Sequence, residues 1–329
     1  MSDQARKSGN LERRIRDAER NLFAAVGADF DEFFIELAQT GLRVRVLSHG
    51  HGPAVIALHG VSESAAIWSP LAAKLPGFRL LAVDLPGHGL SDPAVFQRGR
   101  VRGQARQLVE DILDALELDE VPVIGHSLGA MFALWQVAAG SERISEVIAV
   151  GEPAVALPGV RVRMPLSLLT IRGLGVAVLR SPSPHRVYRR LLAQGLGPAD
   201  VAAAPDSLIE VLRLSARRPG NARTVASVMH AIDRFHHPRP ESVLTSTELA
   251  AITAPTLLIL GFSDPYLTVE QARPSIDRIP GARLYAMPGG HAPWLADAQQ
   301  VAGLIAAHSR FAAGPAAATA PPGADRLVS

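Results

Sequence analysis

Short, largely apolar runs recur along the chain and are separated by stretches with helical periodicity. A continuous apolar run of this kind is typical of a strand that is buried on both faces of a sheet. In the first half of the chain these runs lie at residues 54–58, 79–83, 121–124 and 146–150. Helical patterns occupy the stretches between them, for example residues 101–118. The alternation predicts a parallel sheet with helices on both of its faces.

Two further regions extend the predicted sheet. Apolar and polar residues alternate at 33–38 and 42–47, on either side of a turn at 39–41, which indicates an antiparallel hairpin. Apolar runs return late in the chain, at 255–260 and 283–286. The resulting prediction is an α/β fold in which a mostly parallel, eight-stranded sheet is flanked by helices.

The strand pattern stops between Glu152 and Thr253, where Arg, Pro, Leu and Ala are abundant and helix-like pieces follow one another. This segment is too long to be a loop within a compact domain. We therefore predict an inserted helical cap at 153–253, lying over the edge of the sheet. The cap would divide the core into a first part at 33–152 and a second part at 254–311.

The two ends of the chain differ from this core. Residues 1–32 are predicted to form an N-terminal helical extension, in which the polar helix at 11–26 is expected to be a surface appendage. Packing on the main body and a homodimer contact are the alternatives for this helix. An amphipathic helix at 296–311 is expected to close the core. Residues 312–329 are rich in Ala, Pro and Gly and are expected to be disordered.

Composition and charge exclude several classes of function. The chain has 33 Lys and Arg against 31 Asp and Glu, with no long basic run, which argues against nucleic acid as the main partner. It has no cysteine, so a disulfide framework, a thiol nucleophile and a thiolate metal site are excluded. The charged first residues lack the pattern of a secretory signal, and no apolar window is long enough to span a membrane. We therefore expect a cytoplasmic protein.

The most informative motif is Gly-His-Ser-Leu-Gly at residues 125–129. It lies between the apolar run at 121–124, which breaks at Gly125, and a helical pattern at 131–139. A G-x-S-x-G pattern can present a nucleophilic serine only where it lies on a strand, a tight turn and a helix in that order. Gly125 and Gly129 supply small residues where the helix passes close to the strand. Ser127 then lies at the apex of the turn. The alternative is a glycine-rich turn with an incidental serine.

A serine nucleophile needs a base within hydrogen-bond reach and a third group that orients the base. Asp264 follows the predicted strand at 255–260, and His291 follows the one at 283–286. The carboxyl ends of parallel strands meet at one edge of a sheet, where ligands bind in open α/β folds. Both side chains are therefore expected at the same edge as Ser127.

Five short pieces, in order and each at a predicted strand end, resemble the motifs of cap-bearing serine hydrolases of the α/β-hydrolase superfamily, the esterase- and lipase-like members in particular. The pieces are His59-Gly60, 84–92, 125–129, 261–264 and Gly290-His291. The resemblance covers about residues 33–311. It implies that Ser127 is the nucleophile, His291 the general base and acid, and Asp264 its orienting partner. It also implies an oxyanion hole formed by the backbone N–H groups of Val61 and Leu128, and no cofactor or metal.

Other polar residues near these motifs are less favoured for catalysis. Glu152 follows the neighbouring strand and is an alternative to Asp264 as the orienting group. The remaining residues of this kind are expected to have structural or solvated positions: His59, His88, His126, Asp84, Asp92, His236 and His237.

A serine at the elbow favours acyl transfer, because relatives that open epoxides or displace halide carry a carboxylate there. The predicted function is hydrolysis of a carboxylic ester or related acyl compound through an acyl-enzyme on Ser127. The alternatives on the same triad are hydrolysis of C–C bonds in dienoates, of lactones or of amides, and acyl transfer to an acceptor other than water. A non-catalytic protein that binds a small ligand is the alternative from another class.

The expected partner is a small-molecule acyl substrate with an apolar part. Four residues near the motifs are candidates for an apolar substrate pocket, with a core position as the alternative for each: Trp68, Met131, Phe262 and Trp294. Trp135 is expected in the core. The arginines of the predicted cap are expected to form a solvated face, with a substrate carboxylate as the alternative partner: Arg161, Arg163, Arg172, Arg180, Arg186, Arg189 and Arg190.

Overall fold

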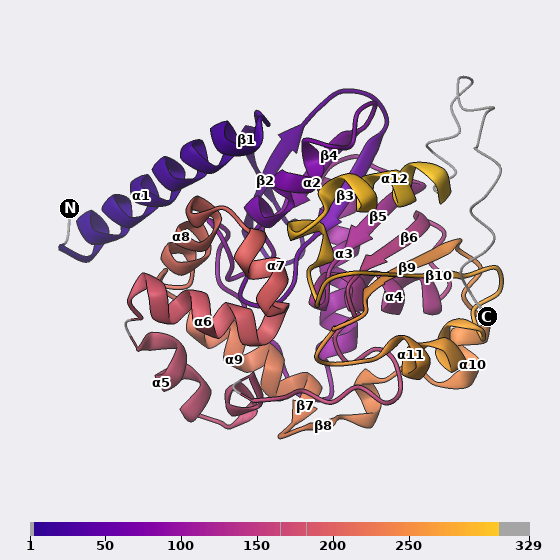
Figure 1. The fold of residues 1–329 in the computed structure, drawn as a ribbon. Helices are drawn as coiled ribbons and strands as arrows, with labels where there is room; N and C mark the ends of the chain where they lie inside the picture. The colour runs from indigo at the N-terminus through magenta and orange to yellow at the C-terminus, as the bar shows by residue number, and fades with distance from the viewer. Residues whose placement is uncertain (1–2, 165, 182, 309–329) are drawn as a thin grey trace.

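The structure, a computed structural model, describes residues 3–164, 166–181 and 183–308 of the chain (Figure 1). The segment at 312–329, expected to be disordered, lies outside the described residues, and so does the end of the predicted closing helix. Among the described residues, no helix combines the length and the apolar character that crossing a bilayer requires.

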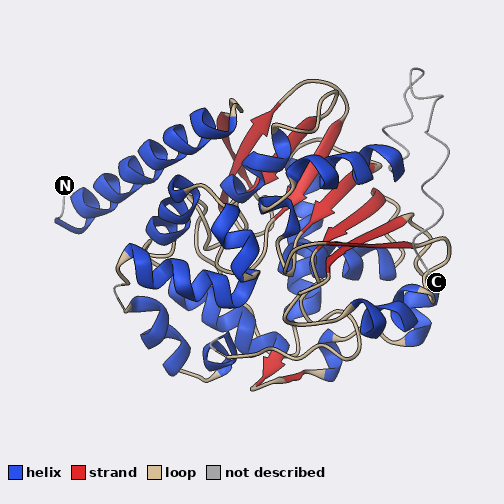
Figure 2. Ribbon diagram, viewed as in Figure 1, coloured by secondary structure: helices blue, strands red, loops and turns tan. Residues whose placement is uncertain are grey.

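The described part of the chain contains a central eight-stranded sheet in the order β1-β2-β4-β3-β5-β6-β9-β10 (Figure 2). β1 (Asp31–Glu36) pairs antiparallel with β2 (Arg43–His49), and β2 pairs antiparallel with β4. All other neighbours in this sheet are parallel. The other strands are β3 (Ala54–Leu58), β4 (Arg79–Val83), β5 (Val121–Gly125), β6 (Ile144–Val150), β9 (Thr256–Gly261) and β10 (Arg283–Met287). The predicted α/β fold with a mostly parallel, eight-stranded sheet is confirmed.

Helices cover both faces of this sheet, because alternate residues of each buried strand point to opposite faces. In β3, Ile56 and Leu58 belong to the hydrophobic core on one face, whereas Val55 and Ala57 belong to the core on the other. Helices α3 (Val101–Ala115) and α4 (Leu128–Ala138) contribute to the first core, and α1 (Asp3–Val26), α2 (Ser69–Ala72) and α12 (Ala298–His308) contribute to the second. The short helices α10 (Ser246–Ala250) and α11 (Val269–Ile276) flank β9 in the sequence.

The helices inserted between β6 and β9 lie on the side toward which the arrowheads of the parallel strands point (Figure 1). They are α5 (Leu174–Arg180), α6 (His185–Leu196), α7 (Pro198–Ala203), α8 (Asp206–Ser215) and α9 (Asn221–Ile232), followed by the short hairpin of β7 (Asp233–Arg234) and β8 (His237–Pro238). We refer to α5–α9 as the cap helices. Their position over the carboxyl ends of the strands encloses the predicted site.

The N-terminal helix α1 is packed on the body of the protein, so the expected surface appendage is wrong. Its side chains of Ile15 and Leu22 are fully buried, and Ala18 is nearly so. Helix α1 packs against α8, and Arg218 forms an ion pair with Glu12 across this junction. The polar composition of the helix concealed a narrow apolar stripe with the helical period.

A buried cluster of charges joins α1 to the sheet. The Arg45 side chain on β2 is fully buried and forms ion pairs with Glu19 of α1, at 2.5 Å, and with Asp84, at 2.8 Å. Asp84 also accepts hydrogen bonds from the backbone N–H groups of Ala65 and Leu90. Asp84 therefore stabilises the loop that follows β4, as the sequence indicated.

Replacing Arg45 with methionine is expected to lower the free energy of unfolding by about 3–5 kcal/mol, because two buried carboxylates lose their counter-charge. Arg79→Met on β4 is the matched control, since Arg79 is exposed and makes a single hydrogen bond to Ser48. Its effect is expected to be within about 1 kcal/mol. Urea denaturation of both variants measures the difference, and equal stabilities would contradict the assigned role of the cluster.

Candidate active site

Ser127 lies in a strained turn between β5 and α4. Its backbone angles are φ 47° and ψ −110°, a conformation that a non-glycine residue rarely adopts. A Cβ atom at Gly125 would lie 2.5 Å from the Ala130 backbone, and one at Gly129 would lie 2.2 Å from the Leu58 carbonyl oxygen. Both positions therefore require glycine. The strand, turn and helix predicted around Ser127 are present, and they hold its side chain at the wall of a pocket.

Asp264 and His291 form a hydrogen-bonded pair at the same edge of the sheet. Nδ1 of His291 lies 2.8 Å from Oδ2 of Asp264. The Asp264 carboxylate also accepts hydrogen bonds from the backbone N–H groups of Glu152 and Tyr266. Burial acts to raise the pKa of Asp264, but the charge of His291 and these hydrogen bonds lower it overall. The aspartate is thus held ionised beside Nδ1, and Nε2 of His291 is left for another partner.

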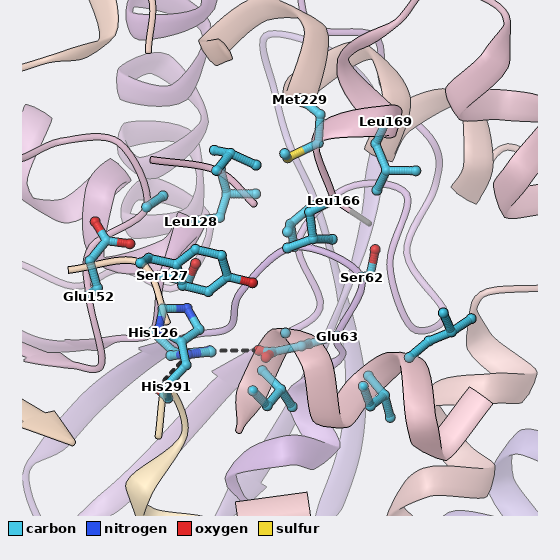
Figure 3. Close-up of a pocket in the computed structure, with 18 of the residues that line it drawn as sticks. Ser62, Glu63, His126, Ser127, Leu128, Glu152, Leu166, Leu169, Met229 and His291 are labelled. Atoms are coloured by element: carbon cyan, nitrogen blue, oxygen red, sulfur yellow. Dashed lines mark hydrogen bonds and ion pairs between the residues drawn. The ribbon is translucent and has the colours of Figure 1, made fainter. Parts of the chain in front are cut away.

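Ser127 and His291 line the same pocket and lie together at one side of it in Figure 3. Both side chains are buried, at 8% and 3% exposure. Among the described residues, no hydrogen bond joins Ser127 Oγ to His291 Nε2. Catalytic hydrogen bonds are often long in the absence of substrate and tighten when it binds. The structure therefore brings the three predicted side chains to one pocket, but the hydrogen bond between Ser127 and His291 is not formed.

The two residues predicted to supply oxyanion donors, Val61 and Leu128, line the same pocket as Ser127. Val61 follows β3, Leu128 is the first residue of α4, and both residues line the pocket. In the described part of the chain, neither N–H donates a hydrogen bond to another group. The N–H groups in the first turn of a helix have no partner within the helix and favour negative charge. These two donors are available to an oxyanion.

His126 links the loops that carry the site. Its Nδ1 lies 3.0 Å from Oε2 of Glu63, and its Nε2 lies 3.1 Å from the backbone oxygen of His291. The same oxygen of Glu63 accepts a hydrogen bond from the backbone N–H of Gly60. Both ring nitrogens of His126 thus lie within hydrogen-bond distance of an oxygen atom. The chain of contacts ties the loop after β3, the turn at Ser127 and the loop of His291 to one another.

Glu63 was not singled out from the sequence, although it lies only three residues after Gly60. Its burial acts to raise the pKa of the carboxyl group, but the neighbouring His126 lowers it overall. Glu63 is therefore an ionised carboxylate at the wall of the pocket.

Glu152, the alternative to Asp264, also lines the pocket but has a different environment. Its side chain is 1% exposed, and Oε1 has no hydrogen-bond partner among the described residues. Burial raises the pKa of Glu152 well above its ordinary value, and the charge of Asp264 adds to the effect. No hydrogen bond joins the Glu152 carboxyl group to His291 in the described part of the chain. The geometry thus favours Asp264 as the orienting group.

The raised pKa of Glu152 gives a prediction for stability. The unfolded carboxyl group loses its proton near pH 4–5, whereas the folded one keeps it, so folding is disfavoured as pH rises from there toward the folded pKa. Glu152→Gln removes this dependence. The unfolding free energy of the variant relative to the parent is expected to increase by up to about 1.4 kcal/mol per pH unit above this point. Thermal unfolding between pH 4.5 and 8 measures it, and parallel curves for the two proteins would contradict the assignment.

The pocket itself is a cavity of about 180 Å³ between the sheet edge and the cap helices. Most of its walls are apolar side chains from the cap, including Leu166, Leu169 and Met229, which Figure 3 shows opposite His291. Two tyrosines, Tyr188 of α6 and Tyr266 close to Asp264, also line it. The sequence did not identify these residues, because their position depends on how the cap packs on the core.

The predicted substrate residues Trp68, Met131, Phe262 and Trp294 are not among the residues that line the pocket, so this prediction is wrong. Trp68 and Trp294 are fully buried and stack on each other, with ring centroids 4.9 Å apart. Met131 is fully buried in a hydrophobic core, and Phe262 is 63% exposed. Closeness to a motif in the sequence did not place these side chains in the cavity. Trp135 is in the core, as expected.

The remaining histidines near the motifs have structural contacts. His59 is fully buried and accepts a hydrogen bond from the backbone N–H of Leu85, and His88 accepts one from that of Ser62. Burial lowers the pKa of His59 to about 3 and also lowers the pKa of His88, so both are neutral. His236 Nδ1 donates to the backbone oxygen of Val162.

Comparison with known proteins agrees with this architecture. A family model described as alpha/beta hydrolase fold matches residues 53–293, well over half of the chain. The chain therefore belongs to this family, and the resemblance seen in its motifs is confirmed.

The proteins that this chain is similar to carry different activities in their names. A 2-hydroxy-6-oxononadienedioate/2-hydroxy-6-oxononatrienedioate hydrolase of Cupriavidus pinatubonensis is 27% identical over 82% of this chain and 88% of its own length. Among solved structures, the carboxylesterase CesB of Bacillus subtilis is similar with a TM-score of 0.72 and 20% identity, covering 91% of this chain and 98% of that one. A 2-hydroxy-6-oxo-6-phenylhexa-2,4-dienoate hydrolase of Rhodococcus has a TM-score of 0.68 and 19% identity, covering 85% of this chain and 99% of that one. The structural similarities show the shared fold.

Proposed function

We propose that the protein hydrolyses carboxylic esters or related acyl compounds through an acyl-enzyme on Ser127. The observation that carries this proposal is the placement of Ser127, at a strained elbow, in the same pocket as the hydrogen-bonded pair His291–Asp264. A serine hydroxyl beside an oriented imidazole is the arrangement that acyl transfer needs.

The chemistry follows from the positions of these groups. Nε2 of His291 accepts the proton of Ser127 Oγ as the oxygen attacks the carbonyl carbon, and the oxyanion accepts hydrogen bonds from the N–H groups of Val61 and Leu128. Collapse of the tetrahedral intermediate breaks the bond to the alcohol, which takes the proton from His291. A water then gives its proton to His291 and attacks the acyl carbon. This step releases the carboxylic acid and returns the proton to Ser127.

The names of two sequence relatives suggest a second candidate function, the hydrolysis of C–C bonds in dienoates. The charges of the residues that line the pocket favour ester hydrolysis over this candidate. A dienoate carries a carboxylate that would have to be buried with a partner of opposite charge. No Arg or Lys is among the described residues that line the cavity, whereas the ionised carboxylate of Glu63 is. The pocket therefore favours an uncharged substrate with an apolar acyl or alcohol group.

A matched pair of substrates tests this preference. We expect kcat/KM for an uncharged p-nitrophenyl alkanoate to exceed that for the same ester with a terminal carboxylate by about 100-fold, and that a 2-hydroxy-6-oxo-dienoate is cleaved more slowly than the alkanoate. Release of p-nitrophenol and loss of dienoate absorbance measure the rates. Faster turnover of the dienoate would replace the proposed function with C–C bond hydrolysis.

A further inference from the structure

Two stripes of exposed apolar side chains lie on neighbouring cap helices. Leu174 and Val178 are one turn apart on α5 and are 42% and 38% exposed. Val187 and Leu191 are one turn apart on α6 and are 45% and 40% exposed. Residues four apart lie on the same face of a helix. Each helix therefore presents an apolar stripe to solvent.

The two stripes converge at the opening of the active-site pocket. Val178 of α5 and Leu191 of α6 line the pocket and are also partly exposed, so they lie where the cavity meets solvent. Further in, Leu179 and Leu192 continue the apolar wall. The two stripes and these leucines thus form an apolar surface that runs from the outside of the cap into the cavity, and none of these side chains is charged.

The same part of the cap is strongly and uniformly basic. Residues 153–199 contain seven arginines and no aspartate or glutamate. Six of the arginines are exposed, and among the described residues none of these six forms an ion pair: Arg161, Arg163, Arg172, Arg180, Arg186 and Arg190. The seventh, Arg189, is paired with Asp206. Four of the unpaired arginines flank the apolar stripes on α5 and α6 or precede them closely: Arg172, Arg180, Arg186 and Arg190.

We propose that this surface, the two apolar stripes with Arg172, Arg180, Arg186 and Arg190, docks on an anionic lipid bilayer; we refer to it as the α5–α6 face. Apolar side chains that project from a helix enter the boundary between headgroups and acyl chains, and arginines beside them bind anionic headgroups. A second copy of this chain does not fit, because pairing the face with itself would bring unpaired arginines against one another with no acidic residue between them.

Docking in this orientation would place the pocket opening against the lipid. An apolar acyl chain could then pass from the bilayer into the cavity along Val178 and Leu191 without crossing water. This consequence for the substrate rests on the proposed esterase function. The docking itself does not, since it requires no chemistry at Ser127.

Sedimentation of the full-length protein with vesicles tests the docking separately from catalysis. We expect binding to vesicles of phosphatidylcholine with phosphatidylglycerol to be about tenfold or more tighter than to phosphatidylcholine alone, and to weaken as salt is raised. The triple variant Arg172→Glu, Arg180→Glu and Arg186→Glu is expected to lose about 100-fold in affinity, from about fivefold for each arginine near the surface. The double variant Leu174→Ser and Val187→Ser is expected to lose about tenfold or more.

Matched controls make each outcome decisive. The variant Arg98→Glu, Arg273→Glu and Arg278→Glu changes the net charge equally, at exposed positions outside the cap helices, and is expected to keep most of the binding. All variants are expected to hydrolyse a short soluble ester at the parent rate, because none of the changed residues lines the pocket. Absence of vesicle binding by the parent protein, equal losses in the two triple variants, or undiminished binding by the double serine variant would each overturn the docking. A failure to hydrolyse any ester would overturn only the proposed function.

Discussion

Replacing Ser127 with alanine is expected to lower kcat for an uncharged p-nitrophenyl ester by about 10⁵-fold. The elbow offers a single hydroxyl to a bound carbonyl, and loss of the nucleophile removes the acyl-enzyme route altogether. The residual rate would come from the oxyanion donors and from binding alone. Initial rates measure this loss, at enzyme concentrations high enough for the catalysed rate to exceed the background rate of ester hydrolysis.

Ser62→Ala is the matched control for this prediction. Ser62 is also a serine at the pocket wall, and its Oγ has no hydrogen-bond partner among the described residues. Its backbone N–H, which donates to His88, is kept in the variant. We expect its rate to remain within about tenfold of the parent. A similar loss in both variants would mean that damage to the pocket, and not removal of a nucleophile, explains the effect.

The second large effect is expected for Asp264→Asn, with kcat reduced by about 10³–10⁴-fold. Asp264 holds the proton of His291 on Nδ1 and thereby leaves Nε2 free to accept the serine proton. An asparagine in its place can donate to Nδ1 and stabilise the wrong tautomer. The asparagine oxygen can still accept the hydrogen bond from the backbone N–H of Tyr266, whereas the N–H of Glu152 loses its acceptor at Oδ2. Circular dichroism therefore accompanies the kinetics of this variant.

Glu152→Gln separates the roles of the two carboxyl groups at this edge of the sheet. Glu152 is already neutral and makes no hydrogen bond to His291 in the described part of the chain, so its replacement is expected to change kcat by less than about tenfold. Steady-state kinetics of the two variants, with circular dichroism to confirm folding, give the comparison. If Glu152→Gln lost more activity than Asp264→Asn, the orienting carboxylate would have been assigned to the wrong strand.

The positions of the three proposed catalytic residues could be predicted from the sequence because a local pattern marks each of them. Ser127, Asp264 and His291 follow apolar runs that are long enough to identify as strands, and the carboxyl ends of parallel strands meet at one edge whatever lies between them. The two glycines at the elbow carry further information, since their contacts leave no room for a Cβ atom. The strands and the positions of these three residues can thus be predicted from residues that are close together in the sequence.

The substrate pocket could not be predicted in the same way. Its walls come largely from Tyr188, Leu191 and other cap residues, whose positions depend on how helices far apart in the sequence pack together. Trp68 and Met131 lie near the motifs in the sequence, yet their large apolar side chains are buried in the two cores on opposite faces of the sheet. Periodicity shows that a side chain is buried but does not show whether it faces a core or a cavity.

The position of α1 was missed for a related reason. The arginine and glutamate residues of this helix predict a solvent-exposed helix. The buried ion pair of Glu19 shows instead that one face of the helix packs on the protein. That partner, Arg45, is 26 residues away on β2 and is fully buried. A buried ion pair between distant residues has no local signal in the sequence.

The central claim is that Ser127 is a nucleophile activated by His291. The most direct measurement is reaction of the protein with an uncharged alkyl fluorophosphonate, followed by peptide mass spectrometry, in the parent and in His291→Ala. Ser127 is expected to carry the phosphonyl group in the parent, and the labelling rate is expected to fall by about 10³-fold or more in the variant. An unlabelled Ser127 in folded parent protein, or equal labelling rates in both proteins, would contradict the account.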